Sequence, residues 1–218
     1  MQLEAKLEPS SLSIDYYDRS IVITGDIYDE KEENKNVFVA KYSQLGALLW
    51  IKQFGTEEND YSEGVVIDLY DRSIVIVGHT YGTFLDNVKT GHSDMFIARI
   101  SSTSEIIWIK QYGVDGWMIS YTSLVIDSYD RSIVVNCRVY NESLNNFILI
   151  AKFNSTGTLQ WTKSYAVDTD STTKSIALDP YDRSIITTGY TLGELEGNIN
   201  YGYFDTFVIK TTKDGDIN

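Results

Sequence analysis

The pentapeptide Tyr17-Asp18-Arg19-Ser20-Ile21 occurs four times in this chain of 218 residues, and it decides the fold. The later copies begin at Tyr70, Tyr129 and Tyr181, which gives spacings of 53, 59 and 52 residues. An aspartate lies two residues before each copy, at Asp15, Asp68, Asp127 and Asp179. Repetition at such a period is typical of architectures in which each copy forms one unit of supersecondary structure. The sequence therefore predicts four structural repeats.

Two further markers divide each repeat into strands. An apolar run that ends in a basic residue follows each pentapeptide, as at 96–99, and Trp-x-Lys follows in the first three copies, as at 108–110. In the second copy we expect strands at residues 65–68, 73–78, 95–100 and 106–112. These segments are rich in β-branched and aromatic residues and are bounded by Gly, Ser, Asn and Asp, which favours strands. Four short strands per repeat indicate a propeller blade.

We therefore predict an all-β fold, a β-propeller of four blades in which each blade is a four-stranded antiparallel sheet. A single domain should span residues 1–218, with repeats at about 9–55, 56–113, 114–165 and 166–218. The fourth copy lacks Trp-x-Lys, so residues 1–8 are expected to supply its last strand. Closure within one chain would give a four-bladed ring, whereas exchange with a neighbour would give a larger ring or a filament. The chain could also be a fragment of a longer protein.

The stretch at 41–55, followed by 64–68 and 74–78, resembles the bacterial and archaeal β-propeller repeat known as the SBBP repeat. That family typically shows Asp-x-x-Gly-Asn before the second strand and then Lys-x-x-x-x-Gly-x-x-x-Trp. This chain departs from the pattern in one consistent way, because Tyr-Asp-Arg-Ser replaces the Gly-Asn turn in all four copies. The resemblance implies a propeller fold and an extracellular or cell-surface location, and it names no ligand.

The net charge of −13 argues against nucleic acid as a partner, because phosphates would be repelled.

The connections between the strands of a propeller lie at two opposite ends of its sheets. The longer connections should share one end, which we call the loop end: 26–36, 55–64, 79–94, 113–122, 138–146, 166–175 and 190–205. They hold 18 of the 31 acidic and 5 of the 18 basic residues, and thus account for the whole net charge.

Variable loops on a rigid scaffold commonly carry binding sites. Acidic groups beside aromatic rings suit a glycan, a basic protein surface or calcium, and ordinary solvated loops are the alternative. The candidate binding residues are Tyr28, Glu57, Glu58, Asp60, Tyr61, Tyr81, Trp117, Tyr121, Asp168, Asp170, Tyr201 and Tyr203. Asp60, Asp168 and Asp170 are the candidates for calcium, although their spacing matches no known calcium loop.

The opposite end, which we call the turn end, should display the repeated turns. Asp favours the start of a turn, and each Arg could pair with the Asp of its own or an adjacent repeat. The structural turn residues are Tyr17, Asp18, Arg19, Tyr70, Asp71, Arg72, Tyr129, Asp130, Arg131, Tyr181, Asp182 and Arg183. A ring of Tyr and Arg that docks a symmetric partner is the alternative interpretation.

The sequence favours a non-catalytic binding or scaffold protein whose partner is a glycan or another protein, with a homo-oligomer as an alternative. A hydrolase or lyase that uses His79 and His92 is a further alternative, since both lie in one predicted loop.

No apolar run reaches the ~18 residues needed to span a membrane, and the N-terminus has no apolar signal-peptide core. Cys137 is the only cysteine, which excludes an internal disulfide.

Overall fold

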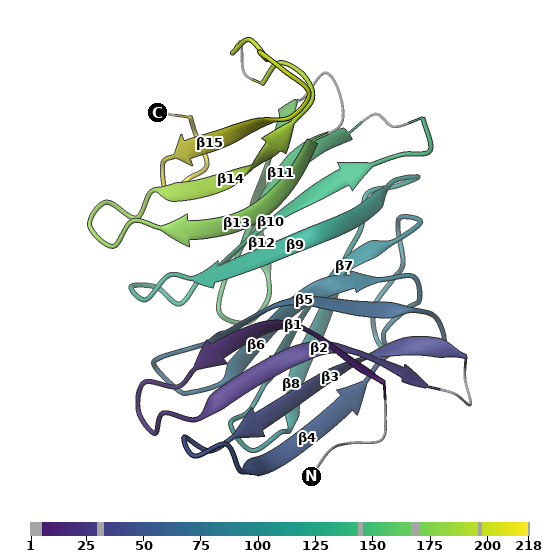
Figure 1. Ribbon diagram of the computed structural model, residues 1–218, viewed down its shortest axis with the longest axis vertical. Helices are drawn as coiled ribbons and strands as arrows, with labels where there is room; N and C mark the ends of the chain where they lie inside the picture. Colours follow the sequence, from purple (N-terminus) through teal and green to yellow (C-terminus); the bar gives the residue numbers. More distant parts are fainter. Residues whose placement is uncertain (1–5, 30–32, 144–145, 167–170, 196–197, 218) are drawn as a thin grey trace. The chain divides into compact units, whose positions relative to one another are not determined.

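The computed structural model describes residues 6–29, 33–143, 146–166, 171–195 and 198–217. The chain divides into two compact units, Met1–Gly113 and Val114–Asn218, and each unit contains two of the four repeats (Figure 1). Among the described residues, all fifteen regular elements are strands, and every strand pairing is antiparallel. The predicted all-β class is therefore confirmed.

The first unit holds two four-stranded sheets, each a meander in which consecutive strands pair (Figure 1). The first sheet consists of β1 (Leu7–Ile14), β2 (Ile21–Asp29), β3 (Asn34–Tyr42) and β4 (Leu48–Phe54). The second sheet consists of β5 (Asp60–Ile67), β6 (Ile74–Thr80), β7 (Asp94–Ile100) and β8 (Ile106–Tyr112).

The second unit holds the third and fourth sheets of the chain, which repeat this meander. The third sheet consists of β9 (Met118–Ile126), β10 (Ile133–Tyr140), β11 (Asn146–Phe153) and β12 (Leu159–Ala166). The fourth consists of β13 (Ser171–Leu178), β14 (Ile185–Thr191) and β15 (Asp205–Thr211), so it has three strands in the described part of the chain. After β15 a single bridge joins Thr211 to Ile217.

The expectation that the N-terminus completes the fourth sheet is wrong for the residues that the structure describes. Leu7 pairs with Ile27 and Glu8 with Asp26, so both belong to β1 of the first sheet. A β-bulge leaves Ser10 unpaired and shifts the register, and β1 pairs with β2 on both sides of it. Residues 1–5 of the predicted closing strand lie outside the described residues.

A similar bulge lengthens the first strand of the second sheet beyond the predicted 65–68. Glu63 is the extra residue between the pairs Ser62–Gly78 and Gly64–Val77, and β5 therefore begins at Asp60. The position opposite the bulge is tight, since a Cβ on Gly78 would lie 1.9 Å from the carbonyl oxygen of Tyr61. Only glycine fits such a close approach without a shift of the backbone.

The two sheets of a unit pack face to face, and the first strand of the later sheet lies against the earlier one. In the first unit, β5 lies beside β1, and its Val65 packs in one buried cluster with Val22 and Val39 (Figure 1). In the second unit, Ile176 of β13 packs in one buried cluster with Val134 and Ile150. Burial of these aliphatic side chains stabilises each pair of sheets.

The outer strands add contacts between the sheets of a unit. The indole N–H of Trp50 in β4 donates to the carbonyl oxygen of Ser102 over 3.2 Å. The hydroxyl of Tyr165 in β12 donates to the carbonyl oxygen of Gly215 over 2.7 Å. In each case the last strand of one sheet reaches the turn after the third strand of the next. The Trp-x-Lys marker thus belongs to the contact between sheets.

The bulge geometry predicts the effect of filling the space at Gly78. We expect Gly78→Ala to lower the free energy of unfolding by about 1–3 kcal/mol, because the new methyl group displaces the backbone of β5. Urea denaturation followed by circular dichroism measures the change. Gly202→Ala is the control, because a Cβ there would meet its nearest atom at 3.8 Å. Equal stability of the two variants would show that the close approach is not a constraint.

Candidate functional site

Each Tyr-Asp-Arg-Ser segment forms the turn between the first two strands of its sheet. In the first copy, Asp15 accepts the N–H of Tyr17 over 3.0 Å, and Asp18 accepts the N–H of Ser20 over 2.9 Å. The same two bonds recur in the other copies. The arginine in each copy has a left-handed backbone, with φ between 57° and 62°. This conformation is unfavourable for a residue with a side chain, and in each copy the arginine N–H donates to the carbonyl oxygen of the aspartate four residues earlier. For Arg72 and Arg183, an interaction of the side chain adds to this bond.

In the first unit, that interaction reaches across to the preceding sheet. Nε of Arg72 donates to Oδ2 of Asp15 over 2.8 Å, and Nη2 of Arg72 contacts Asp18. The guanidinium also lies 5.0 Å from the centre of the Tyr17 ring. Lys41 of β3 approaches Asp15 to 3.8 Å, and Asp15 is almost fully buried. The second sheet is therefore tied to the turn of the first by charge-assisted bonds and a cation–π contact.

The second unit repeats the same geometry. Nε of Arg183 donates to Oδ2 of Asp127 over 2.7 Å, Nη2 contacts Asp130, and the guanidinium lies 4.7 Å from the Tyr129 ring centre. Lys152 of β11 lies 3.8 Å from Asp130. We call this contact, an arginine on the Asp, Tyr and Asp of the preceding turn, the inter-sheet ion pair. The sequence left the partner repeat open, and in both units the partner is the preceding sheet.

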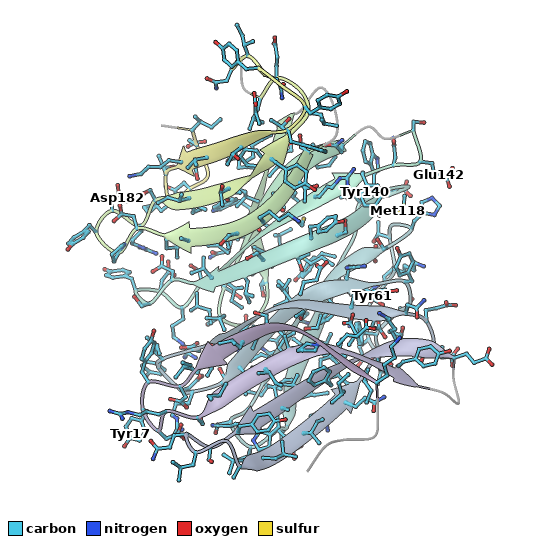
Figure 2. All side chains as sticks on the ribbon, in the orientation of Figure 1. Tyr17, Tyr61, Met118, Tyr140, Glu142 and Asp182 are labelled. Carbon is cyan, nitrogen blue, oxygen red and sulfur yellow. The ribbon has the colours of Figure 1, made fainter. Side chains whose placement is uncertain are left out.

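At the opposite end of the first unit, the predicted aromatic residues form a stack. Figure 2 places Tyr17 at the turn end and Tyr61 at the loop end of this unit. Tyr61 stacks on His79 with ring centres 4.8 Å apart, and Tyr81 meets both rings edge-on. Lys35 lies 5.3 Å from the Tyr61 ring centre. Both faces of Tyr61 therefore have neighbours, and Tyr28, at 41% exposure, is the more accessible ring here.

The candidate Asp60 is not a surface ligand, because its side chain is fully buried. It accepts the N–H of Thr56 over 2.5 Å and so holds the loop before β5, while its burial raises its pKa. Asp94 performs the same task before β7, where it accepts the N–H groups of Thr90 and Gly91. Burial likewise raises the pKa of Asp26. The loop end therefore carries less surface charge than its residue count predicts, although Glu57 and Glu58 are exposed.

The loop end of the second unit presents exposed aromatic rings. Tyr201 and Tyr203 are each 89% exposed, and Tyr121 is 46% exposed with Lys174 4.8 Å from its ring centre. Trp117 is half-buried and packs edge-on against Phe147 at 5.3 Å. The candidates Asp168 and Asp170 lie outside the described residues.

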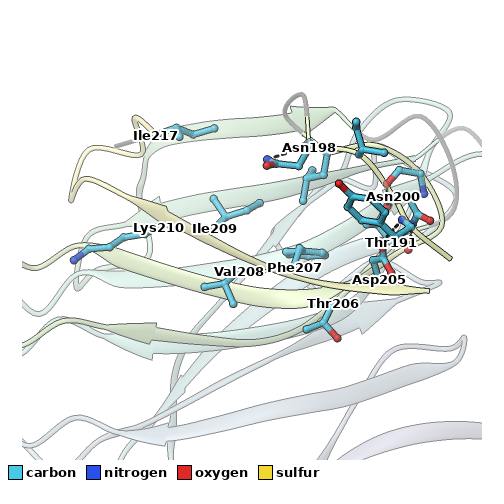
Figure 3. A pocket seen from close by; sticks show the side chains of 14 residues that line it. Thr191, Asn198, Asn200, Asp205, Thr206, Phe207, Val208, Ile209, Lys210 and Ile217 are labelled. Atoms are coloured by element: carbon cyan, nitrogen blue, oxygen red, sulfur yellow. Dashed lines mark hydrogen bonds between the residues drawn. The ribbon is translucent and has the colours of Figure 1, made fainter. Parts of the chain in front are cut away.

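A pocket of about 600 Å³ lies between the β14–β15 loop and β15 (Figure 3). Buried Leu195, Phe207 and Ile209 give it apolar walls. Polar groups and one aromatic ring complete the lining: Thr191, Asn198, Asn200, Tyr201, Asp205 and Lys210. Sequence reasoning placed Tyr201 and the loop at a binding face, but it missed the pocket, because the loop's own hydrogen bonds shape it.

Those bonds use the polar side chains of the lining. Oδ2 of Asp205 accepts the N–H of Tyr201 over 2.6 Å, and Asn200 donates to the carbonyl oxygen of Thr191 over 3.1 Å. Asn198 donates to the carbonyl oxygen of Leu195, also over 3.1 Å. In the described part of the chain, Oδ1 of Asp205 has no hydrogen bond, so this oxygen can accept one from a ligand hydroxyl.

The two histidines do not form a joint site in the described residues. His79 lies in β6 against Tyr61, with Nδ1 3.4 Å from Oε1 of Glu63, and no contact joins it to His92 there. Within the same residues, no group of three or more His, Cys, Asp or Glu could hold a metal ion. Cys137 is buried and remains a thiol, since the chain has no second cysteine.

The chain is similar to a solved sialidase. The structure titled "Hadza microbial sialidase Hz136" matches 95% of this chain with a TM-score of 0.61 and 11% sequence identity. The match covers 44% of that protein, so this chain spans less than half of its length. No family model and no curated protein matches the sequence. The likeness confirms the predicted β-propeller fold, and at this identity it shows the fold alone.

The sequence predicted no segment that spans a membrane. Among the described residues, no helix is long and apolar enough to cross a bilayer.

The inter-sheet ion pair predicts that Arg72 contributes to stability and that Arg19 contributes far less. We expect Arg72→Ala to lower the free energy of unfolding by about 1–3 kcal/mol, since it leaves the buried Asp15 without its closest cation. Arg19→Ala is the matched control, because Arg19 has the same backbone conformation but no ion pair in the described part of the chain. Urea denaturation in dilute solution measures both. Equal losses would show that the turn, and not the pair, is responsible.

The aspartates of these turns also predict a response to acid. The neighbouring Ser20 lowers the pKa of Asp18 to about 2 against the opposing effect of burial, and Lys41 and Arg72 add to the shift. Burial raises the pKa of Asp130, but Ser132 and the cations Arg183 and Lys152 outweigh it and bring the value to about 2. A folded-state pKa below the ordinary 3.8 stabilises the fold above that pH, and the contribution is lost as the pH falls towards 2.

We therefore expect the melting temperature to fall between about pH 4 and pH 2, and Asp18→Asn to reduce that fall. Thermal denaturation at half-unit steps of pH measures the slope. Asp115→Asn, at an exposed loop position, is the control and should leave the slope unchanged. The account fails if Asp18→Asn leaves the acid slope of the wild-type protein intact.

Proposed function

We propose that this protein is a non-catalytic binding module that engages an uncharged, hydroxyl-rich glycan in the pocket beside β15. The observation that carries the proposal is the combination of apolar walls, exposed Tyr201 and convergent polar groups in one cavity of about 600 Å³. Ligand pockets of this size commonly pair an apolar surface with a few placed polar groups. A sugar ring matches such a lining, because its C–H face can stack on tyrosine while its hydroxyls meet amide and carboxylate oxygens.

Charge favours an uncharged sugar over an acidic one. Among the described residues, the lining holds one carboxylate, Asp205, one ammonium group, Lys210, and no arginine. The exposed loop side chains nearby include Tyr203 and Phe204, which add apolar surface without charge. An acidic sugar would need a fixed cation to pair with its carboxylate, and no lining residue that the structure describes carries the bidentate group suited to that task.

The same residues support binding without catalysis. Most glycoside hydrolases place two carboxylates on either side of the scissile bond, whereas Asp205 is the one carboxylate among the described residues that line the pocket. Sialidases differ, since they use a tyrosine nucleophile. The likeness to a sialidase supports a glycan as the ligand class. The single carboxylate among the described lining residues supports the non-catalytic role against the two-carboxylate mechanism, and a chromogenic sialoside tests the tyrosine mechanism, because Tyr201 lies in the lining. The resemblance to the SBBP repeat is consistent with this proposal.

Binding to a defined panel of sugars tests the proposal. Isothermal titration with cellohexaose, mannopentaose and chitotetraose should detect at least one ligand, whereas sialyllactose should not bind. Tyr201→Ala should raise the dissociation constant about tenfold, because a stacked aromatic contact contributes about 1 kcal/mol beyond its buried area. Tyr181→Ala is the matched control: Tyr181 is 96% exposed in the same unit but lies in the turn between β13 and β14.

Two results would contradict the proposal. If no neutral oligosaccharide binds, or if Tyr201→Ala and Tyr181→Ala bind equally well, the pocket is not a glycan site. If the protein releases sugar from any of the panel, or from a chromogenic sialoside, its role is catalytic.

A further inference from the structure

Within each unit, one face of the earlier sheet receives the first strand of the later sheet. In the first unit, Val22, Val37 and Val39 form the receiving face, and each is fully buried. Val65 and Ile67 of β5 fill it and are 7% and 5% exposed. The inter-sheet ion pair closes the same junction at the turn end, where Arg72 meets the preceding turn.

The junction of the second unit has the same parts. Val134, Ile148 and Ile150 form the buried receiving face, and Ile176 of β13 fills it at 8% exposure. Asn136 adds a hydrogen bond of 3.1 Å to the carbonyl oxygen of Ser175 in β13. One type of junction, with an apolar face and an arginine on two aspartates, therefore occurs in both units.

The first sheet carries the entering half of this junction on its open surface. Counted from the turn aspartate, Leu12 and Ile14 take the places of Val65 and Ile67, yet they are 64% and 47% exposed. Arg19 takes the place of Arg72, and its side chain has no hydrogen bond or ion pair in the described part of the chain. We call Leu12, Ile14 and Arg19 the β1–β2 face.

The fourth sheet carries the receiving half. Val208 takes the place of Val39, and it is 68% exposed, pointing with Thr206 away from Ile209 on β15 (Figure 3). Asp179 and Asp182 take the places of Asp15 and Asp18. Their cation in the described residues is Lys210 of the same sheet, at 3.8 and 3.3 Å. Val208, Asp179, Asp182 and Tyr181, which is 96% exposed, form what we call the β14–β15 face.

We propose that the β14–β15 face of one copy binds the β1–β2 face of a second copy, so that chains associate head to tail. The two faces are complementary in charge, with an arginine on one and two carboxylates on the other. They are complementary in apolar surface as well, with Leu12 and Ile14 opposite Val208. Because the two faces differ, the contact is heterologous and extends into a ring or a filament. This inference does not require that the pocket binds a glycan, although Val208 and Lys210 also line that pocket.

Charge reversal tests the contact, with mass measured by light scattering over a range of protein concentrations. The wild-type chain should show a mass that rises with concentration. Arg19→Asp and Asp182→Arg should each raise the apparent dissociation constant at least about tenfold, because like charges then oppose each other across the contact.

The decisive sample is an equal mixture of the two single variants. The carboxylate introduced by Arg19→Asp in one chain then meets the guanidinium introduced by Asp182→Arg in the other. The unchanged Arg19 and Asp182 also meet, so the mixture should regain the mass of the wild-type protein. A mixture restores only contacts between chains. A chain that carries both Arg19→Asp and Asp182→Arg is the control for a contact within one chain. If all samples remain monomeric, or if this double variant alone regains thermal stability without a gain in mass, the proposal is overturned.

Asp182 also accepts the N–H of Ser184, so Asp182→Arg removes a bond of its own turn. Leu12→Glu provides a second route, since Leu12 is 64% exposed on β1 and its replacement leaves both turns intact. This variant should be monomeric with a circular dichroism spectrum like that of the wild-type protein. Association of Leu12→Glu at the wild-type concentration dependence would contradict the proposal.

Discussion

The fold depends on one recurring contact, in which an arginine with a left-handed backbone reaches the two aspartates and the tyrosine of the preceding turn. The left-handed conformation costs about 1–2 kcal/mol for a side chain of this kind, and glycine or asparagine would avoid it. Arginine suits the position of Arg72, because a long, planar cation spans the gap and bonds Asp15 and Asp18 together. In each unit, one copy of the pentapeptide thus takes part in a contact between sheets as well as in its own turn.

The same contact separates the two ends of the sheets. The turn end is short and repeated, and in each unit the earlier turn presents its acceptors to the arginine of the later sheet. The connections at the loop end vary, and the β14–β15 loop folds back to form a pocket. The turn end thus joins the sheets of a unit, and the loop end carries the pocket that we propose for a ligand.

Much of this was predictable from the sequence, and the exceptions have physical causes. The pentapeptide and the apolar runs placed β6, β7 and β8 to within about two residues at each end, because their pattern and their bounding residues agree. The start of β5 was missed because a bulge at Glu63 interrupts the period. Asp60 was taken for a surface group because a carboxylate that accepts backbone N–H groups has no distinct pattern in sequence. The stack of Tyr61 on His79 depends on strand register, which sequence alone does not supply.

A double-mutant cycle between Arg72 and Asp15 shows whether the inter-sheet ion pair couples the two sheets. The free energies of unfolding of the wild-type protein, Arg72→Met, Asp15→Asn and the double variant would be measured by urea denaturation at pH 7. If the inter-sheet ion pair joins the sheets, the two substitutions are coupled by about 1–3 kcal/mol, because each already removes the contact that the other would lose. Losses that add within about 0.5 kcal/mol would contradict the account.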